Sequence, residues 1–314
     1  AYTSREVTAY YARVLADDTA LALDVIADIL LNPVFDPAEI EVERGVILQE
    51  IGQANDTPDD IIFDWLQERA YPGQPLGRTI LGEAERISAM TREDLARFVA
   101  ERYGPGQLIL SAAGAVDHDT IVAQADALFS ALEPRGDSVA LRAQFGGGET
   151  RRSRDLEQAH IALAFEAPGY RDPEFYAAQV FSTALGGGMS SRLFQEIREK
   201  RGLCYTIFAQ SGAYSDTGLT TIYAGTGGSE IAALSRLIVD ELKRSAEDMS
   251  QAEIDRARAQ MKAGLLMGLE SPSSRAERLA RMIQIWGHVP AIADTVARID
   301  AVTAADVKTV AEHV

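Results

Sequence analysis

The sequence contains one cysteine, four histidines and no long apolar run among its 314 residues. The single cysteine, Cys204, excludes an internal disulfide and a cysteine-rich zinc site. No apolar run approaches the ~18 residues of a membrane span, and no leader opens the chain, so cytoplasmic location is the default expectation. Basic residues are scarce, with 30 Lys and Arg against 47 Asp and Glu, and the net charge is −17. This balance argues against nucleic acid as a partner.

What the sequence does contain is a helix, expected over residues 36–51, with two glutamates on one face. Asp36 can cap it and Pro37 suits its first turn. Glu43 and Glu50 are seven residues apart, about two turns at ~3.6 residues per turn, so both carboxylates project from the same face. That half-apolar face makes them candidates for metal or acid–base chemistry. The alternative is that both are solvated, because glutamate is a favoured surface residue of helices.

Capping and breaker residues divide the rest of the chain into helices and short strands. One helix is expected between Asp18 and Asn32, on the apolar positions Leu21, Val25, Ile26 and Ile29. Thr91, with Asp94 three positions on, is expected to start another. Strands are expected over residues 108–116, 161–165, 204–210 and 219–224. Residues 134–154 turn to Gly, Arg and polar side chains and are interpreted as a linker.

The two halves of the chain match each other. Residues 28–30, 38–40 and 86–87 match residues 240–242, 252–254 and 298–299, at offsets of 212 to 214. A nearly constant offset indicates an internal duplication. We therefore predict an α+β fold with two homologous domains, 1–133 and 155–314, each a mostly antiparallel sheet backed by helices. In the second copy Ala257 and Gly264 stand opposite the two glutamates, so the helix does not need those carboxylates in order to form.

The duplication also predicts what lies beyond the ends of the chain. The second copy has a strand, a helix and a glycine loop over residues 158–203, before the counterpart of Tyr2. The first copy should have them too, so about 45 residues are expected to precede Ala1. The second copy ends at Val314, before the counterparts of the last strand and helix expected in the first copy.

Five segments resemble the pitrilysin/insulinase metallopeptidases, in particular the branch with the β subunit of mitochondrial processing peptidase and its bacterial relatives. They are AYTSREVTAYYA at the start, ERGVILQE at 43–50, GRTILG at 77–82, GGGMSSRLFQEIREKRGLCYTI at 186–207 and YAGT at 223–226. The resemblance implies a zinc-dependent endopeptidase acting on extended peptides or presequence-like segments. It also implies a clamshell of four such domains, hence a homodimer or a heterodimer with a related subunit.

The resemblance also implies roles for particular residues. Glu50 matches the distant zinc-binding glutamate, and Glu43 matches the acid that supports the site. Arg198 and Tyr205 match an arginine and a tyrosine placed over the substrate carbonyl; the alternative is a surface arginine and a tyrosine packed at a sheet edge. Finally, Ala1, Tyr2 and Thr3 match the edge strand along which a peptide aligns.

The sequence departs from this family in having no His-x-x-Glu-His motif, the helix that would supply two zinc ligands and a base. The four histidines, His118, His160, His288 and His313, are scattered and are expected at the surface or at strand ends. By the duplication, the motif would lie before Ala1. The main alternative is a non-catalytic partner or scaffold subunit of the same fold. A phosphate-binding loop at residues 225–228 is a weaker alternative, because no Walker lysine is present.

Overall fold

The structure, a computed structural model, describes residues 1–134 and 141–314. Within this part the chain forms two compact units, each built from three separate segments. The helical unit comprises Ala1–Gln53, Thr79–Leu141 and Gly268–Val289, and the sheet unit comprises Ala54–Arg78, Arg142–Met267 and Pro290–Val314. The predicted linker falls partly outside the described residues. In the described ranges, no helix combines the length and apolarity that a membrane span requires.

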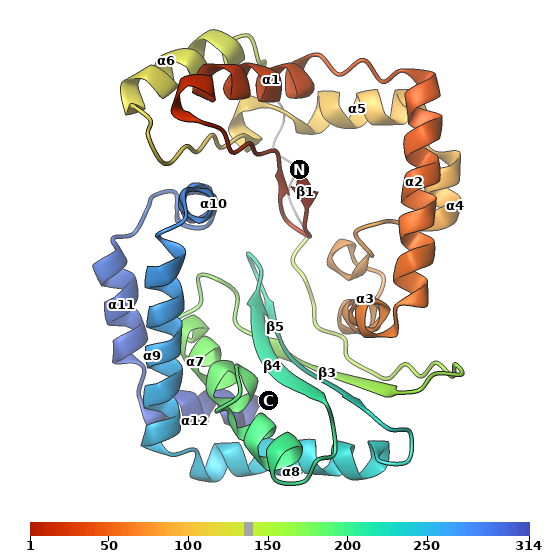
Figure 1. Cartoon of the computed structure of the whole chain (residues 1–314), viewed down its shortest axis with the longest axis vertical. Coiled ribbons are helices and arrows are strands. Elements are labelled where there is room, and N and C mark those ends of the chain that lie inside the picture. Colours follow the sequence, from red (N-terminus) through yellow and green to blue (C-terminus); the bar gives the residue numbers. More distant parts are fainter. Residues whose placement is uncertain (135–140) are drawn as a thin grey trace. The chain divides into compact units, whose positions relative to one another are not determined.

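The sheet unit contains the three-stranded sheet and the helices that pack on it (Figure 1). Its elements are α3 (Pro58–Ala70), η2 (Pro75–Gly77), β3 (Ala159–Ala167), α7 (Phe175–Gly186), η4 (Phe194–Glu199), β4 (Thr206–Ala213), β5 (Gly218–Thr226), α8 (Ile231–Asp248), α9 (Gln251–Gly268), α11 (Ile292–Ala301) and α12 (Ala304–His313). The strands pair antiparallel in the order β3-β5-β4, so β5 is central and β4 lies at an edge.

Both faces of this sheet are covered. One face carries Ile207 and Ile222 and shares a continuous core with α7, α8 and α12. Phe181 and Leu185 of α7 are fully buried there, and burial of a side chain of this size contributes about 1.5–3 kcal/mol. On the other face, Phe63 of α3 packs against two rings of the sheet; its ring centroid lies 6.2 Å from that of Phe208 and 5.4 Å from that of Tyr223. Packing on both faces therefore fixes the position of the edge strand β4 within the sheet unit.

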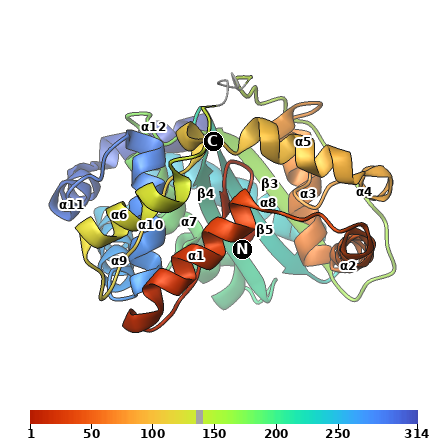
Figure 2. The ribbon, with the colours of Figure 1, turned by 90° about the horizontal axis from the view of Figure 1, so that it is seen from above.

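The helical unit contains β1 (Tyr2–Thr3), β2 (Thr8–Ala9), η1 (Ala16–Asp18), α1 (Thr19–Leu31), most of α2 (Pro37–Asp56), α4 (Ala84–Ala89), α5 (Arg92–Arg102), η3 (Pro105–Gln107), α6 (His118–Phe129) and α10 (Pro272–Trp286). The two short strands pair antiparallel, Tyr2 with Ala9 and Thr3 with Thr8. Helix α1 contacts α6 (Figures 1 and 2). Helices dominate the described fold and its sheets are antiparallel, as the sequence predicted.

The predicted duplication is confirmed by matching capping contacts. Thr91 starts α5 with a capping box in which its hydroxyl accepts from the Asp94 backbone N–H and the Asp94 carboxylate accepts from the Thr91 N–H. Thr303 and Asp306 form the same capping box at the start of α12, 212 residues later. Such a box satisfies two backbone donors that a helix start otherwise leaves unpaired.

Two arginines at equivalent positions of the two halves, Arg44 and Arg258, also make matching contacts. Arg44 on α2 donates to the backbone carbonyls of Ile87 and Met90, the latter at 2.8 Å. Arg258 on α9 donates to the carbonyls of Asp300 at 2.9 Å and Val302 at 3.0 Å. In both copies the arginine therefore fastens the long helix to the turn that precedes the capped helix.

Two helices at equivalent positions of the two halves each belong to the compact unit formed mainly by the other half. Helix α3 follows α2 in the first half of the chain, yet it packs on β3 in the sheet unit. Its counterpart α10 follows α9 in the second half but belongs to the helical unit, where the carbonyl of Ala276 accepts from the Ser111 hydroxyl at 2.7 Å. The compact units are therefore not simple halves of the sequence, and the domain boundaries at 133 and 155 stay a prediction.

Two details differ from the expectations. Residues 108–116 form no strand, and Ile109 and Leu110 are each more than two-fifths exposed, because no described strand pairs with this segment. Helix α1 forms over the expected range, but its buried residues are Leu23 and Ala27. Leu21, Val25 and Ile29, which mark the helix in the sequence, are exposed among the described residues.

Candidate functional site

The helix that carries the two candidate glutamates forms as predicted. Asp36 caps α2 by accepting from the backbone N–H of Ala38 at 2.8 Å and of Glu39 at 3.4 Å. Glu43 and Glu50 are both exposed, and α2 has no fully buried residue. Arg44, the neighbour of Glu43 in sequence, points about 100° away around the helix and makes the contacts to the α4–α5 turn. Glu43 and Glu50 therefore project from a different face of α2 than Arg44, which binds the turn between α4 and α5.

The described residues do not by themselves fit a zinc ion. A catalytic zinc site uses three protein ligands, drawn from His, Cys, Asp and Glu. Across residues 1–134 and 141–314, no group of three such side chains is placed to hold a metal. Glu50 therefore accounts for at most one ligand.

Arg198 and Tyr205, which the family resemblance places over the substrate carbonyl, lie close together in the structure. The Arg198 Cζ atom lies 5.3 Å from the centre of the Tyr205 ring and 4.5 Å from that of Phe194. Tyr205 is 77% exposed, while the Arg198 side chain is 30% exposed and lies 3.5 Å from the Glu199 carboxylate. The two side chains thus present hydrogen-bond donors to solvent, the arrangement that can hold a carbonyl oxygen.

The local backbone explains why these two side chains meet. Residues of η4 form a π-helical turn in which the Lys200 N–H donates to the Gln195 carbonyl at 3.0 Å. Gly202 then adopts a φ of +63°, which a glycine accepts without strain, and turns the chain into β4. Because of this reversal, Tyr205 lies beside the last turn of the helix that carries Arg198. π-helical turns are frequent at functional sites.

Cys204 lies directly before Tyr205 and is buried. Burial raises the pKa of its thiol, and the positive charge of Arg198 opposes this rise only in part. A buried thiol of raised pKa is a poor nucleophile. We therefore interpret Cys204 as a buried structural residue beside the Arg198–Tyr205 pair, not as a nucleophile.

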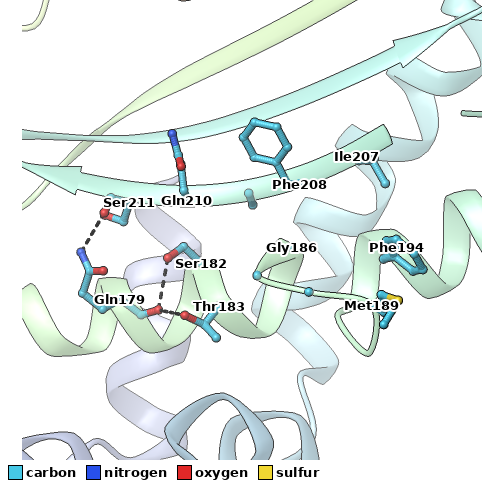
Figure 3. A pocket seen from close by; sticks show the side chains of 13 residues that line it. Gln179, Ser182, Thr183, Gly186, Met189, Phe194, Ile207, Phe208, Gln210 and Ser211 are labelled. Carbon is cyan, nitrogen blue, oxygen red and sulfur yellow. Dashed lines mark hydrogen bonds between the residues drawn. The ribbon is translucent and has the colours of Figure 1, made fainter. Parts of the chain in front are cut away.

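A groove of about 570 Å³ lies between α7 and the edge strand β4, and it was missed at the sequence level (Figure 3). It is lined by side chains from both elements and by the glycines at residues 186–188. Gly186 permits the close approach of α7 to β4, because a Cβ at this position would lie 2.2 Å from the Ala209 nitrogen. A glycine at the end of a helix is a sequence signal that is compatible with such an approach. The groove leaves room for an extended chain beside the edge of β4.

Ala1, Tyr2 and Thr3, the predicted peptide-aligning residues, are all exposed. Tyr2 donates from its phenol to Glu277 at 3.2 Å. Partial burial and the Glu277 charge raise the pKa of that phenol. Within the described residues β1 pairs only with β2, so its second edge has no strand partner there. The alignment of the two halves is expected to place Tyr2 and Thr3 opposite Tyr205 and Thr206, where β4 begins.

The chain matches known proteins over nearly its whole length. Residues 1–84 match the family described as Insulinase (Peptidase family M16), and residues 89–261 match the one described as Peptidase M16 inactive domain. A protein of Rickettsia felis named as an uncharacterized zinc protease is 41% identical over 288 residues, 91% of this chain and 70% of that protein. The chain therefore belongs to peptidase family M16, which confirms the pitrilysin/insulinase resemblance.

Solved structures show the same fold. A protease from Helicobacter pylori has a TM-score of 0.82 at 21% identity, covering 94% of this chain and 73% of that one. A chain of complex III2 from Candida albicans with Inz-5 bound has a TM-score of 0.83 at 24% identity, covering 95% of this chain and 74% of that one.

Proposed function

We propose that this chain works in a zinc-dependent endopeptidase of the processing-peptidase type, which hydrolyses extended peptides or presequence-like segments. The observation that carries the proposal is the Arg198–Tyr205 pair, in a chain whose relative is named a zinc protease. A guanidinium and a phenol side by side can both donate to a peptide carbonyl. They would then stabilise the negative charge that develops on its oxygen during hydrolysis.

In this proposal Glu50 supplies one zinc ligand and Glu43 supports the site. Their common exposed face on α2 leaves both carboxylates accessible to groups that complete it. The remaining ligands come from outside the described residues, since these contain no group of three that could hold the metal.

Ala1, Tyr2 and Thr3 are proposed to align the substrate by adding it as a strand to the second edge of β1. Backbone pairing of this kind accepts many sequences, provided that the peptide is extended. We also propose that the protein acts in the cytoplasm as a homodimer or as a heterodimer with a related subunit.

One observation favours a different function, that of a non-catalytic partner subunit of the same fold. More than half of the chain, residues 89–261, matches a domain described as Peptidase M16 inactive domain. A partner subunit would keep the core and lose hydrolysis.

Cleavage of internally quenched peptides by the protein expressed from its natural gene tests the proposal. We expect Glu50→Gln to abolish hydrolysis, and Tyr205→Phe to lower kcat/KM about tenfold, equivalent to ~1.4 kcal/mol of transition-state stabilisation. Glu39→Gln, an exposed change on the same helix, serves as the control and should leave kcat/KM unchanged. Full activity of the Glu50 variant would refute the assignment. Absence of any cleavage, alone or with a related subunit, would instead favour the partner role.

A further inference from the structure

A second pocket lies in the sheet unit, with no residue in common with the groove beside β4. Its volume is about 400 Å³, and its walls come from the segment just before and within η4, from α8 and from the start of α9. The lining is polar and charged, in contrast to the mixed lining of the first groove. Neither the proposed peptidase site nor the family match assigns a role to it.

One wall of this pocket is a fixed ion pair. The Arg192 side chain is only 8% exposed and donates twice to Glu253, from Nε at 2.8 Å and from Nη2 at 2.9 Å. Arg192 also binds Asp248, and Glu253 accepts from the backbone N–H and hydroxyl of Ser250 at 2.8 and 2.7 Å. Because these side chains already bind one another, they form a fixed wall of the pocket. A ligand would therefore be bound by other residues of the lining.

Two of the residues that line this pocket each have a buried side-chain oxygen with no hydrogen-bond partner among the described residues. Glu241 is 2% exposed; one of its carboxylate oxygens accepts from Arg244 at 2.8 Å, and the other, Oε2, is unpaired. Ser191 is 5% exposed and its hydroxyl is also unpaired. A buried polar atom without a partner costs free energy, and a carboxylate oxygen more than a neutral one. A ligand that donates hydrogen bonds to these two oxygens would remove that cost.

The rim of the pocket carries the opposite charge. Arg256 lines the pocket and is exposed, and within the described part of the chain it makes no ion pair or hydrogen bond. A guanidinium presents a planar fork of donors that matches a carboxylate. The pocket thus combines a buried acceptor with an unengaged cation.

We propose that this pocket binds a free amino acid. The α-ammonium group donates to Glu241 Oε2 and to the Ser191 hydroxyl, while the α-carboxylate binds the Arg256 guanidinium. A metal cation would leave Arg256 unmatched, and the described residues offer no group of three metal-binding side chains here. An inorganic anion would satisfy Arg256 but place negative charge beside the unpaired carboxylate oxygen. Only a ligand with both charges meets both requirements.

Isothermal titration calorimetry of the whole protein with L-alanine, L-leucine and L-glutamate tests the proposal. We expect at least one of them to bind with a Kd below about 1 mM. Its N-acetyl form lacks the ammonium charge and its amide form lacks the carboxylate, so each should bind at least tenfold more weakly. Inorganic phosphate is titrated as a competing probe.

Variants then locate the site. Arg256→Gln and Glu241→Gln should each weaken binding at least tenfold, whereas Arg236→Gln, which removes an exposed arginine of α8 outside the pocket, should not. Circular dichroism confirms that the variants fold, and Arg256 is the safer test because its side chain is exposed. The proposal is overturned if none of the three amino acids binds, if the blocked forms bind equally well, if phosphate binds more tightly, or if Arg256→Gln behaves like Arg236→Gln. Absence of binding by all probes would leave ordered water as the partner of Glu241.

Discussion

The ion pair between Arg192 and Glu253 should make the free energy of unfolding depend on pH. Burial alone would raise the pKa of Glu253, but hydrogen bonds from Arg192 and Ser250 outweigh it and lower the pKa from 4.5 to about 2. At 1.36 kcal/mol for each pKa unit, this difference corresponds to ~3 kcal/mol. The Glu253 side chain is only 16% exposed, so solvent screening removes little of this energy.

The sign of the pH dependence follows from the lowered pKa. Glu253 is more acidic in the folded protein than in the unfolded chain, so its contribution is fully present above pH ~4.5 and is lost as the pH falls toward ~2. We therefore expect Glu253→Gln to lower the free energy of unfolding by about 3 kcal/mol at pH 7, since it also leaves Arg192 without its main partner. The difference between wild type and variant should shrink toward zero near pH 2.

Urea unfolding of the protein, monitored by the tryptophan fluorescence of the sheet unit, measures this difference in the free energy of unfolding. The chain has two tryptophans; Trp65 lies on α3 in the sheet unit and Trp286 in the helical unit, so a Trp286→Phe background makes the signal specific. Glu247→Gln, an exposed change on α8, is the control and should stay within about 0.5 kcal/mol of wild type. A loss below about 1 kcal/mol for Glu253→Gln at pH 7, or a loss independent of pH, would refute the reasoning.

Three further predictions use other contacts of the chain. Thr91→Ala and Thr303→Ala each remove a capping box and should lower the free energy of unfolding by about 1 kcal/mol, as urea titration would show; a loss at only one site would contradict their equivalence. Arg258→Gln removes two bonds to backbone carbonyls and should cost about 1.5–3 kcal/mol, with faster hydrogen exchange confined to the turn before α12. Cys204, buried and with a raised pKa, should react with iodoacetamide at pH 8 at least tenfold more slowly than free cysteine, and an equal rate would be incompatible with its burial.

Local signals in the sequence predicted much of the fold. Asp36 and Thr91 start helices where expected, because a side chain that caps a helix acts within three residues of itself. The constant offset between the halves predicted the duplication, and the repeated Thr303 capping box bears it out. Arg198 and Tyr205 lie close together because only a short reversal of the chain separates them, and their joint action on a substrate stays a prediction.

Long-range features could not be predicted in the same way. A strand over residues 108–116 was expected from composition, yet a strand exists only where another strand pairs with it, and the described residues offer none. The unit to which α3 or α10 belongs depends on packing between distant segments, which no local pattern encodes. The same holds for the amino-acid pocket: Glu241 and Ser191 are 50 residues apart, and only the fold shows that both line one cavity.

The most direct test of the proposed function is the zinc content of the protein expressed from its natural gene, measured by elemental analysis for wild type, Glu50→Gln and the control Glu39→Gln. With Glu50 as a ligand, we expect about one zinc ion per chain in the wild type and in the control. The Glu50 variant should bind zinc with at least tenfold lower affinity and therefore retain less of it. Equal zinc retention by the Glu50 variant, or no zinc in the wild type, would contradict the account.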